Sequence, residues 1–436
     1  MCIKNLYNIS KVLFFDQLAE KEFDHIFIKV QGIMKRLQFN FIENNPENII
    51  NHAKLIDSYF LRQLVFQQQF RLKYLKENNL ELWLALISIY LNDKNPSLAL
   101  ASLRLSGVRS FLHPRESSFS PFFLAGLYTF IQLQMRNLTT SFLFNVRLSP
   151  FCELGTTMSR TNLLVNLNNL EKEKELVEEF SSFFRMIHPA LKVDFYTIPL
   201  KNNDFTSHKF IQKTIKCNAI QENKREDKSI FYKNSYSFSY KKIKEEIINA
   251  QHMILEKDTK IVISFLPENN LSILFSLGYP LESEIFFEKE SIFPKIEDIC
   301  ISSKPLASIV KNYPDYGIAR LDVAGFLKNS LNQLPPGATS LQNYRYYHQF
   351  FFQKIIPEIV KLYNLKENGQ IFIMYSLLDD CALLGPLKKL KLVAENLKQL
   401  YKQKWQGSLK CGFGRIENGT TAADLSFQSL SSMRVI

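Results

Sequence analysis

Residues 370–405, QIFIMYSLLDDCALLGPLKKLKLVAENLKQLYKQKW, decide the fold class. The first of them, Gln370–Tyr375, form a short apolar run, which predicts a buried strand. From Gly385 to Trp405 the apolar residues recur at helical spacing on one face; these are Leu387, Leu390, Ala394, Leu397 and Leu400. A strand followed closely by a long amphipathic helix predicts layered α and β structure in this part of the chain.

Two features of the same segment bear on function. Asp379 and Asp380 follow the strand and can hold a metal ion, although adjacent carboxylates more often mark a turn or a helix N-terminus. The polar face of the helix has one glutamate and six lysines, which stand at positions 388, 389, 391, 398, 402 and 404. Such a face is either solvated or in contact with RNA, and the sequence does not choose between these two interpretations.

The chain as a whole predicts an α+β protein, with a mostly helical N-terminal region followed by mixed α/β layers with short sheets. We expect a helical region at 1–135, a motif-bearing region at 136–258, and an α/β region at 259–436 that includes the basic helix. No internal repeat is visible.

Composition narrows the class of protein. The chain has 436 residues, of which 46% are hydrophobic, and this content excludes global disorder. Its net charge of +12 favours a polyanionic partner, but the same charge also arises without function in lysine-rich genomes. Six cysteines occur without C-x-x-C spacing, which excludes zinc ribbons and fits a reducing cytosol. Neither a signal peptide nor a transmembrane segment is recognisable, so we expect a cytoplasmic protein.

A basic segment stands out at 201–244. It contains 11 Lys and Arg, only 4 Asp and Glu, and seven interleaved aromatic residues. Positive charges and rings together suit RNA, because phosphates take the charge and unstacked bases take the rings. A polar insertion with an aromatic hairpin explains the same composition.

Familiar catalytic motifs are missing from the sequence. It contains no P-loop, no H-E-x-x-H zinc motif and no G-x-S-x-G elbow, and we expect no metal ligands and no cofactor.

The stretch from Asn145 to Leu154 joins a cation, a hydroxyl and a turn in a few residues. Pro150 pushes Ser149 out of the helical region, so the Ser149 hydroxyl and Arg147 stand at a helix exit. This arrangement can bind an anion. It is also explained by a helix that simply ends at Ser-Pro, with Arg147 capping the last carbonyl groups.

Three motifs give the chain a family resemblance. Arg147-Leu148-Ser149-Pro150-Phe151 resembles a signature of lantibiotic and thiopeptide dehydratases, in their tRNA-dependent glutamylation domain. Arg160–Leu164 is similar to the next motif of that family, and the segments Tyr316–Asp322 and Thr339–Phe351 resemble its short Asp-bearing strand and its aromatic helix.

The resemblance implies transfer of a glutamyl group from aminoacyl-tRNA, as co-substrate, onto Ser or Thr of a ribosomally made precursor peptide. It places Arg147 and Ser149 in the catalytic site and Arg345, Asp322 and Asn162 in substrate binding. Elimination of glutamate would need a separate elimination-domain protein, because no such domain follows here.

The departures from the family put catalysis in doubt. Leu143 replaces a second arginine, and Asn162 replaces an acidic residue. Whether the chain is an enzyme therefore stays open. The alternatives are a non-catalytic basic module that binds RNA or protein, and a peripheral membrane protein bound through its basic helices.

Overall fold

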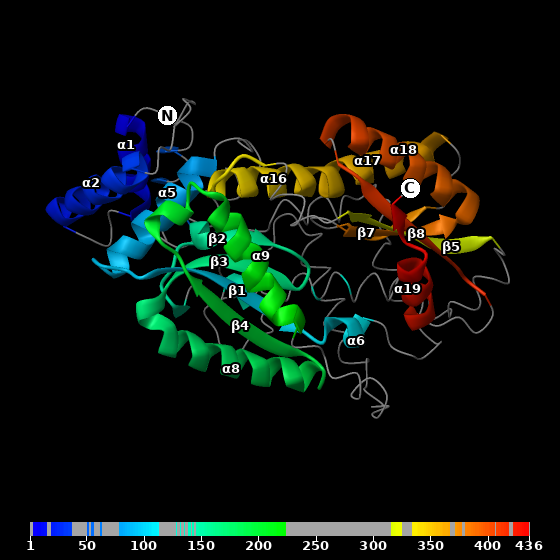
Figure 1. Cartoon of the computed structure of the whole chain (residues 1–436), viewed down its shortest axis with the longest axis horizontal. Coiled ribbons are helices and arrows are strands. Elements are labelled where there is room, and N and C mark those ends of the chain that lie inside the picture. Colours follow the sequence, from blue (N-terminus) through cyan, green and yellow to red (C-terminus); the bar gives the residue numbers. More distant parts are fainter. Residues whose placement is uncertain are drawn as a thin grey trace.

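The computed structural model describes residues 3–14, 19–36, 78–112, 145–223, 315–324, 334–366, 371–376, 380–405, 407–417 and 422–435, with isolated positions between 50 and 62 and between 128 and 143. These residues form an α+β protein, which confirms the fold class expected from the sequence. Figure 1 shows two sheets side by side, with helix α16 (Ala338–Phe350) running along the top from one to the other.

Sheet A belongs to the first half of the chain. Its strands lie in the order β2-β3-β1-β4 and are all antiparallel; they are β1 (Leu98–Ser106), β2 (Glu153–Thr156), β3 (Arg160–Asn166) and β4 (Lys192–Pro199). Helical residues between 128 and 145 join β1 to β2, and helix α8 (Leu170–Ile187) joins β3 to β4. Helix α9 (His208–Asn223) then packs on β4 and β1.

Sheet B belongs to the second half. Its order is β6-β7-β5-β8-β9, again antiparallel; the strands are β5 (Tyr316–Val323), β6 (Phe372–Ser376), β7 (Asp380–Pro386), β8 (Leu409–Arg415) and β9 (Arg434–Val435). Between β5 and β6 the chain forms α16, the π-helical turn η5 (Phe351–Ile355) and α17 (Ile356–Lys366). Helix α18 (Leu387–Trp405) joins β7 to β8, and α19 (Ala422–Ser431) follows β8.

The two sheets repeat one design. Each is built as strand, helix, strand, strand, helix, strand, and the four strands of this unit lie in the order second, third, first, fourth. The sequence gives no sign of the repetition, because alternating burial and backbone pairing can be satisfied by many different side chains.

The two faces of sheet B are covered differently. Because side chains alternate along a strand, Leu321 and Cys381 point to one face, where they form a core with α17 and α18. Ile318, Tyr375 and Leu384 point to the other face and join the large core of the first half of the chain. The two halves therefore share a hydrophobic core.

The N-terminal helices α1 (Ile3–Phe14), α2 (Glu20–Arg36) and α5 (Asn78–Asn92) pack together around buried rings, with Phe27 and Trp83 edge to face at 5.1 Å. Helix α6 (Val108–Leu112) follows β1.

Strand β1 lies inside the region 1–135 that the sequence predicts as mostly helical, and the boundaries at 135 and 258 stay predictions. Of the basic segment 201–244, the structure describes only the part up to 223, and the expected aromatic hairpin lies outside the described residues. No helix among the described residues is long and apolar enough to cross a membrane.

Candidate functional site

A row of charged residues crosses sheet B near the end of β5. Asp322 is paired in register with Asp380 at the start of β7 on one side and with Lys410 at the start of β8 on the other. Residues directly opposite on neighbouring strands point to the same face, so these three side chains stand in a line. Arg320, two residues earlier on β5, points to that face as well.

Arg320 and Asp380 form a two-point ion pair. Arg320 Nη2 donates to Asp380 Oδ2 at 2.5 Å, and Arg320 Nε donates to Asp380 Oδ1 at 3.2 Å. The Tyr375 hydroxyl donates to Asp380 Oδ2 at 3.1 Å, and the Tyr128 ring lies 4.3 Å from the Tyr375 ring, centroid to centroid. Burial raises the pKa of Asp380, whereas the charge and hydrogen bonds of Arg320 act in the opposite direction.

Asp322 forms no such two-point ion pair with any described residue. Burial raises the pKa of its carboxyl group to about 6, the negative charge of Asp380 adds to the rise, and Arg320 and Lys410 oppose it. Asp322 is therefore ionised at neutral pH but takes up a proton in mildly acidic solution. A carboxyl group with this pKa beside charged partners is typical of a functional site.

The row fits a metal ion only together with a ligand. Among the described residues, no group of three or more His, Cys, Asp or Glu is placed to hold a metal. Mg²⁺, however, is commonly held by one or two carboxylates plus the phosphates of a bound nucleotide, and Asp322 and Asp380 supply that number. Asp379, which the sequence paired with Asp380, lies outside the described residues.

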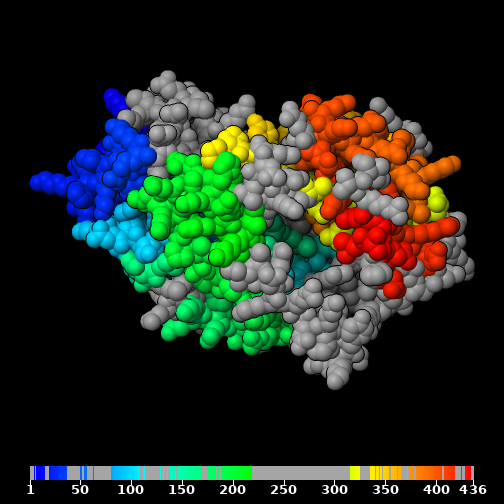
Figure 2. All heavy atoms as spheres, viewed as in Figure 1, coloured from blue at the N-terminus to red at the C-terminus, as the bar shows by residue number. Residues whose placement is uncertain are grey.

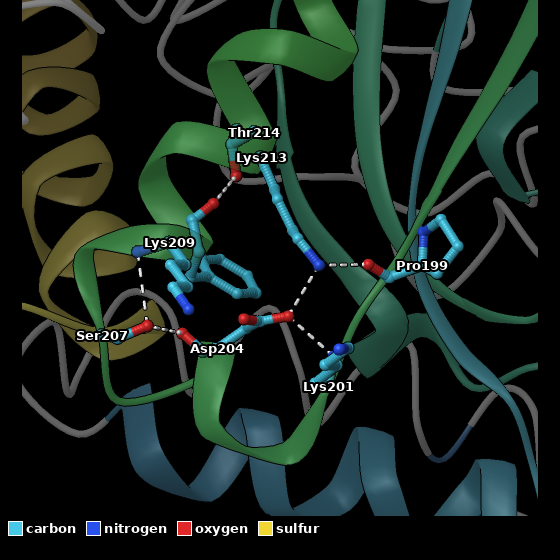
Figure 3. Close-up of polar contacts among 8 residues, drawn as sticks. Pro199, Lys201, Asp204, Ser207, Lys209, Lys213 and Thr214 are labelled. Atoms are coloured by element: carbon cyan, nitrogen blue, oxygen red, sulfur yellow. Dashed lines mark hydrogen bonds and ion pairs between the residues drawn. The ribbon is translucent and has the colours of Figure 1, made fainter.

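A second polar cluster fixes the loop between β4 and α9. The carboxylate of Asp204 is buried and accepts hydrogen bonds from the Lys201 backbone N–H and from Lys213 Nζ, each at 2.7 Å (Figure 3). Burial alone would raise the pKa of Asp204, but these bonds and the charges of Lys213 and Lys209 hold it below its usual value. Lys213 also donates to the Pro199 carbonyl at the end of β4, so the cluster ties the loop to both the strand and the helix.

The loop that this cluster fixes carries the start of α16. The Ala338 backbone N–H donates to the Phe205 carbonyl at 2.8 Å, and a His208 ring nitrogen lies 3.3 Å from the Leu334 carbonyl oxygen. Gly337 has φ 117°, and a Cβ placed on it would lie 3.0 Å from the Phe205 oxygen. The first half of the chain therefore holds the helix that leads into sheet B.

Arg147 lies in a turn, and Ser149 directly precedes a short helix. Ser149 is fully buried and caps the short helix η2 (Pro150–Cys152), accepting a hydrogen bond from the Phe151 N–H at 3.2 Å. Arg147 is exposed, with φ 57°, and its carbonyl accepts a hydrogen bond from Asn92 Nδ2. The Ser149 hydroxyl is thus engaged by the backbone of η2.

The other three predicted residues are divided between the halves. Asn162 on β3 is buried opposite Gly155, and Arg345 of α16 packs over Gly155 and donates to the Leu154 carbonyl at 3.2 Å. Asn162 and Arg345 therefore lie close together, at the joint between sheet A and α16. Asp322 lies apart from that joint, in the charged row of sheet B.

Comparison with known proteins places the fold. No protein-family model matches the chain, and no curated protein matches it. Solved structures do match. The Csm1–Csm4 cassette in complex with one ATP is similar with a TM-score of 0.63 and 13% identity, over 92% of this chain and 63% of that chain.

Two further structures agree with this match. The cassette in complex with cA4 has a TM-score of 0.63 at 12% identity, over 88% of this chain and 62% of that chain. The Csm1–Csm4 subcomplex in the type III-A CRISPR-Csm interference complex has a TM-score of 0.64 at 11% identity, over 90% and 64%. The chain thus spans less than two thirds of the length of the chains that it matches, and the likeness is one of fold.

These matches overturn the resemblance read from the sequence. The similar structures are CRISPR-Csm proteins, so the assignment to the lantibiotic dehydratases is wrong, and with it the glutamyl transfer in natural-product biosynthesis. The expected partners, tRNA, a precursor peptide and an elimination-domain protein, are wrong for the same reason. The short motif around Ser149 that suggested them is explained by helix capping.

The sequence singled out Asp322 for substrate binding and Asp380, with Asp379, as a turn or a metal ligand, but it did not single out Arg320 or Lys410. Arg320 could have been found from alternation along β5, which puts it on the face of Asp322. Lys410 has no local signal, because only the pairing of β5 with β8 brings it beside Asp322.

Proposed function

We propose that this chain binds an adenine nucleotide at the charged row of sheet B, within an assembly of the Csm type. The observation that carries the proposal is the row Asp380, Asp322 and Lys410, crossing three strands of a fold that is similar to a cassette in complex with ATP. The related structures also include complexes with cA4 and with pppApA, so short oligoadenylates are ligands of the same chemistry.

Each residue of the row has a different role in binding the nucleotide. Lys410 forms no ion pair with any described residue, so its ammonium group is the cation that meets the phosphates. Asp322, ionised at neutral pH, holds the Mg²⁺ that accompanies the triphosphate. Arg320 is committed to Asp380 and fixes the position of that carboxylate beside Asp322.

Titration calorimetry of the full chain with MgATP at pH 7.5 tests the proposal. We expect Asp322→Asn and Lys410→Ala each to weaken binding by about tenfold, a loss of roughly 1.4 kcal/mol. Asp315→Asn is the matched control: it makes the same chemical change at an exposed position just before the other end of β5, and should leave affinity unchanged. Absence of binding by the wild type at millimolar MgATP, or equal losses in Asp322→Asn and Asp315→Asn, would contradict the proposal.

Assembly and location belong to the same proposal. We infer a second chain of the Csm4 kind as partner, because the similar structures are Csm1–Csm4 complexes, and a cytoplasmic location with it. Co-purification of the two tagged chains tests the partner. The nucleotide is a ligand in this account, and no resident cofactor is proposed.

A further inference from the structure

Helix α18 carries a straight stripe of charge. Lys388, Lys391, Glu395, Lys398 and Lys402 are spaced by three, four, three and four residues, which puts all of them on one side of an α-helix. At 1.5 Å per residue the stripe is about 21 Å long. Four of its five members are cations.

Four members of the stripe are exposed, and Lys398 is half-buried. The opposite side of α18 is buried against sheet B through Leu390, Val393, Leu397 and Tyr401. Figure 2 shows the orange segment that includes α18 on the outer surface of the molecule. The stripe is therefore available to a partner.

Helix stability does not explain where these lysines stand. Cations stabilise the last turn of a helix, and Lys402 and Lys404 are placed there. Lys388 and Lys389 stand in the first turn, where the helix dipole disfavours positive charge and where α18 has no acidic residue. Among the described residues, no ion pair neutralises Lys388, Lys391 or Lys402. The excess positive charge of the stripe favours binding of a polyanion.

The neighbours of the stripe indicate which polyanion fits. The exposed residues beside it are Leu392, Asn396, Gln399 and Gln403, and none of them has a ring. Single-stranded nucleic acids are bound by stacking bases on aromatic side chains, and none of the exposed side chains that the structure describes on α18 is aromatic. A duplex keeps its bases stacked inside and its phosphates outside, so a straight row of lysines suffices to bind it.

We propose that the α18 stripe binds the phosphate backbone of a nucleic-acid duplex. Four lysine–phosphate contacts give a slope of about −3.6 in a plot of log affinity against log salt, so the affinity falls about a hundredfold between 50 and 200 mM salt. Phosphate contacts carry no sequence information, so the affinity does not depend on the base sequence of the duplex. This surface is separate from the nucleotide row, and the proposal does not depend on nucleotide binding.

Fluorescence anisotropy with fluorescein-labelled 24-bp RNA and DNA duplexes and the matching single strands is the test. The stripe variant K388E/K391E/K398E/K402E is compared with K4E/K21E/K35E/K54E, which makes the same change in net charge at exposed positions on the N-terminal part of the chain. We expect the stripe variant to lose at least tenfold in duplex affinity and most of the salt slope, and the control to lose less than threefold. E395K, which fills the gap in the stripe, should tighten binding.

Three outcomes would overturn the proposal. Equal losses in the two quadruple variants would mean that net charge alone acts and that the stripe is a solvated face. Tighter binding of single strands would point to base stacking elsewhere, and displacement of the duplex by poly-glutamate at equal charge concentration would indicate an acidic protein as partner. A thermal unfolding transition and a circular dichroism spectrum like those of the wild type show that the stripe variant is folded, which keeps this test separate from the nucleotide proposal.

Discussion

Sheets A and B have the same connectivity and strand order, yet their polar groups are used in different ways. On sheet A, the hydroxyl of Thr161 lies 2.8 Å from that of Thr156 and 2.8 Å from that of Thr139 in the preceding helical segment, and Thr156 donates to Glu153. In sheet B, Asp322 and Lys410 have no such closed network. We propose that one unit serves as scaffold and that the other carries a site, so the shared fold alone does not assign a function.

Among the variants that test this difference between the sheets, Arg320→Met should change the free energy of unfolding most. It leaves Asp380 and Asp322 side by side without the cation that separates their charges. Because both partners of the ion pair are mostly buried, we expect a loss of about 3 kcal/mol in the free energy of unfolding at pH 7.5, measured in urea. Lys410→Met, which removes a cation that has no ion-pair partner among the described residues, should cost less than about 1 kcal/mol. Equal losses would mean that the Arg320–Asp380 pair is not special.

Asp322→Asn should stabilise the protein in neutral solution. The pKa of Asp322 is raised from 3.8 to about 6 in the folded state, so the stability that this group contributes is fully present below pH 3.8 and is lost as the pH rises through 6. We expect the variant to gain about 2 kcal/mol over the wild type at pH 8, and the gain to vanish near pH 4. Thermal unfolding across that pH range measures it, and a gain independent of pH would contradict the burial of the charge.

Gln342→Leu tests the joint between α16 and the first half of the chain. Gln342 is 1% exposed, and neither amide atom has a hydrogen-bond partner among the described residues. A buried polar group without partners costs free energy, so leucine should raise the free energy of unfolding by about 1.5 kcal/mol. Gln399→Leu, on the exposed face of α18, is the control and should change little. A loss of stability would show that Gln342 is hydrated or bonded in solution.

Apart from the control variants, the smallest effect is expected for Gly337→Ala. An alanine at φ 117° is strained, and its Cβ would press on the Phe205 carbonyl that accepts the Ala338 N–H. We expect a loss of about 1 kcal/mol in urea unfolding. An unchanged free energy of unfolding would mean that the start of α16 is not held by the loop of Asp204.

The sequence predicted the local elements of sheet B better than their assembly. The strand and helix expected at 370–375 and 385–405 correspond to β6 and α18, because apolar runs and helical periodicity are local signals. The row of Asp380, Asp322 and Lys410 depends on the register of three strands, which no local pattern encodes.

The error in function has the same origin. Arg147 and Ser149 looked like a site because their types suit anion binding, but Ser149 is buried and caps a helix. A five-residue motif does not record whether its hydroxyl faces solvent or the backbone. Asn162 and Arg345 do lie close together, but only the fold brings them there.

We propose that Asp322 in sheet B holds the cation of a bound nucleotide. The most direct test is the MgATP affinity of the wild type and of Asp322→Asn at pH 5.0 and 7.5, since the comparison of the two proteins cancels the titration of ATP itself. We predict that the wild type gains about tenfold over the variant as the pH rises through the pKa of Asp322, about 6. An affinity ratio that is the same at both pH values would contradict this role of Asp322.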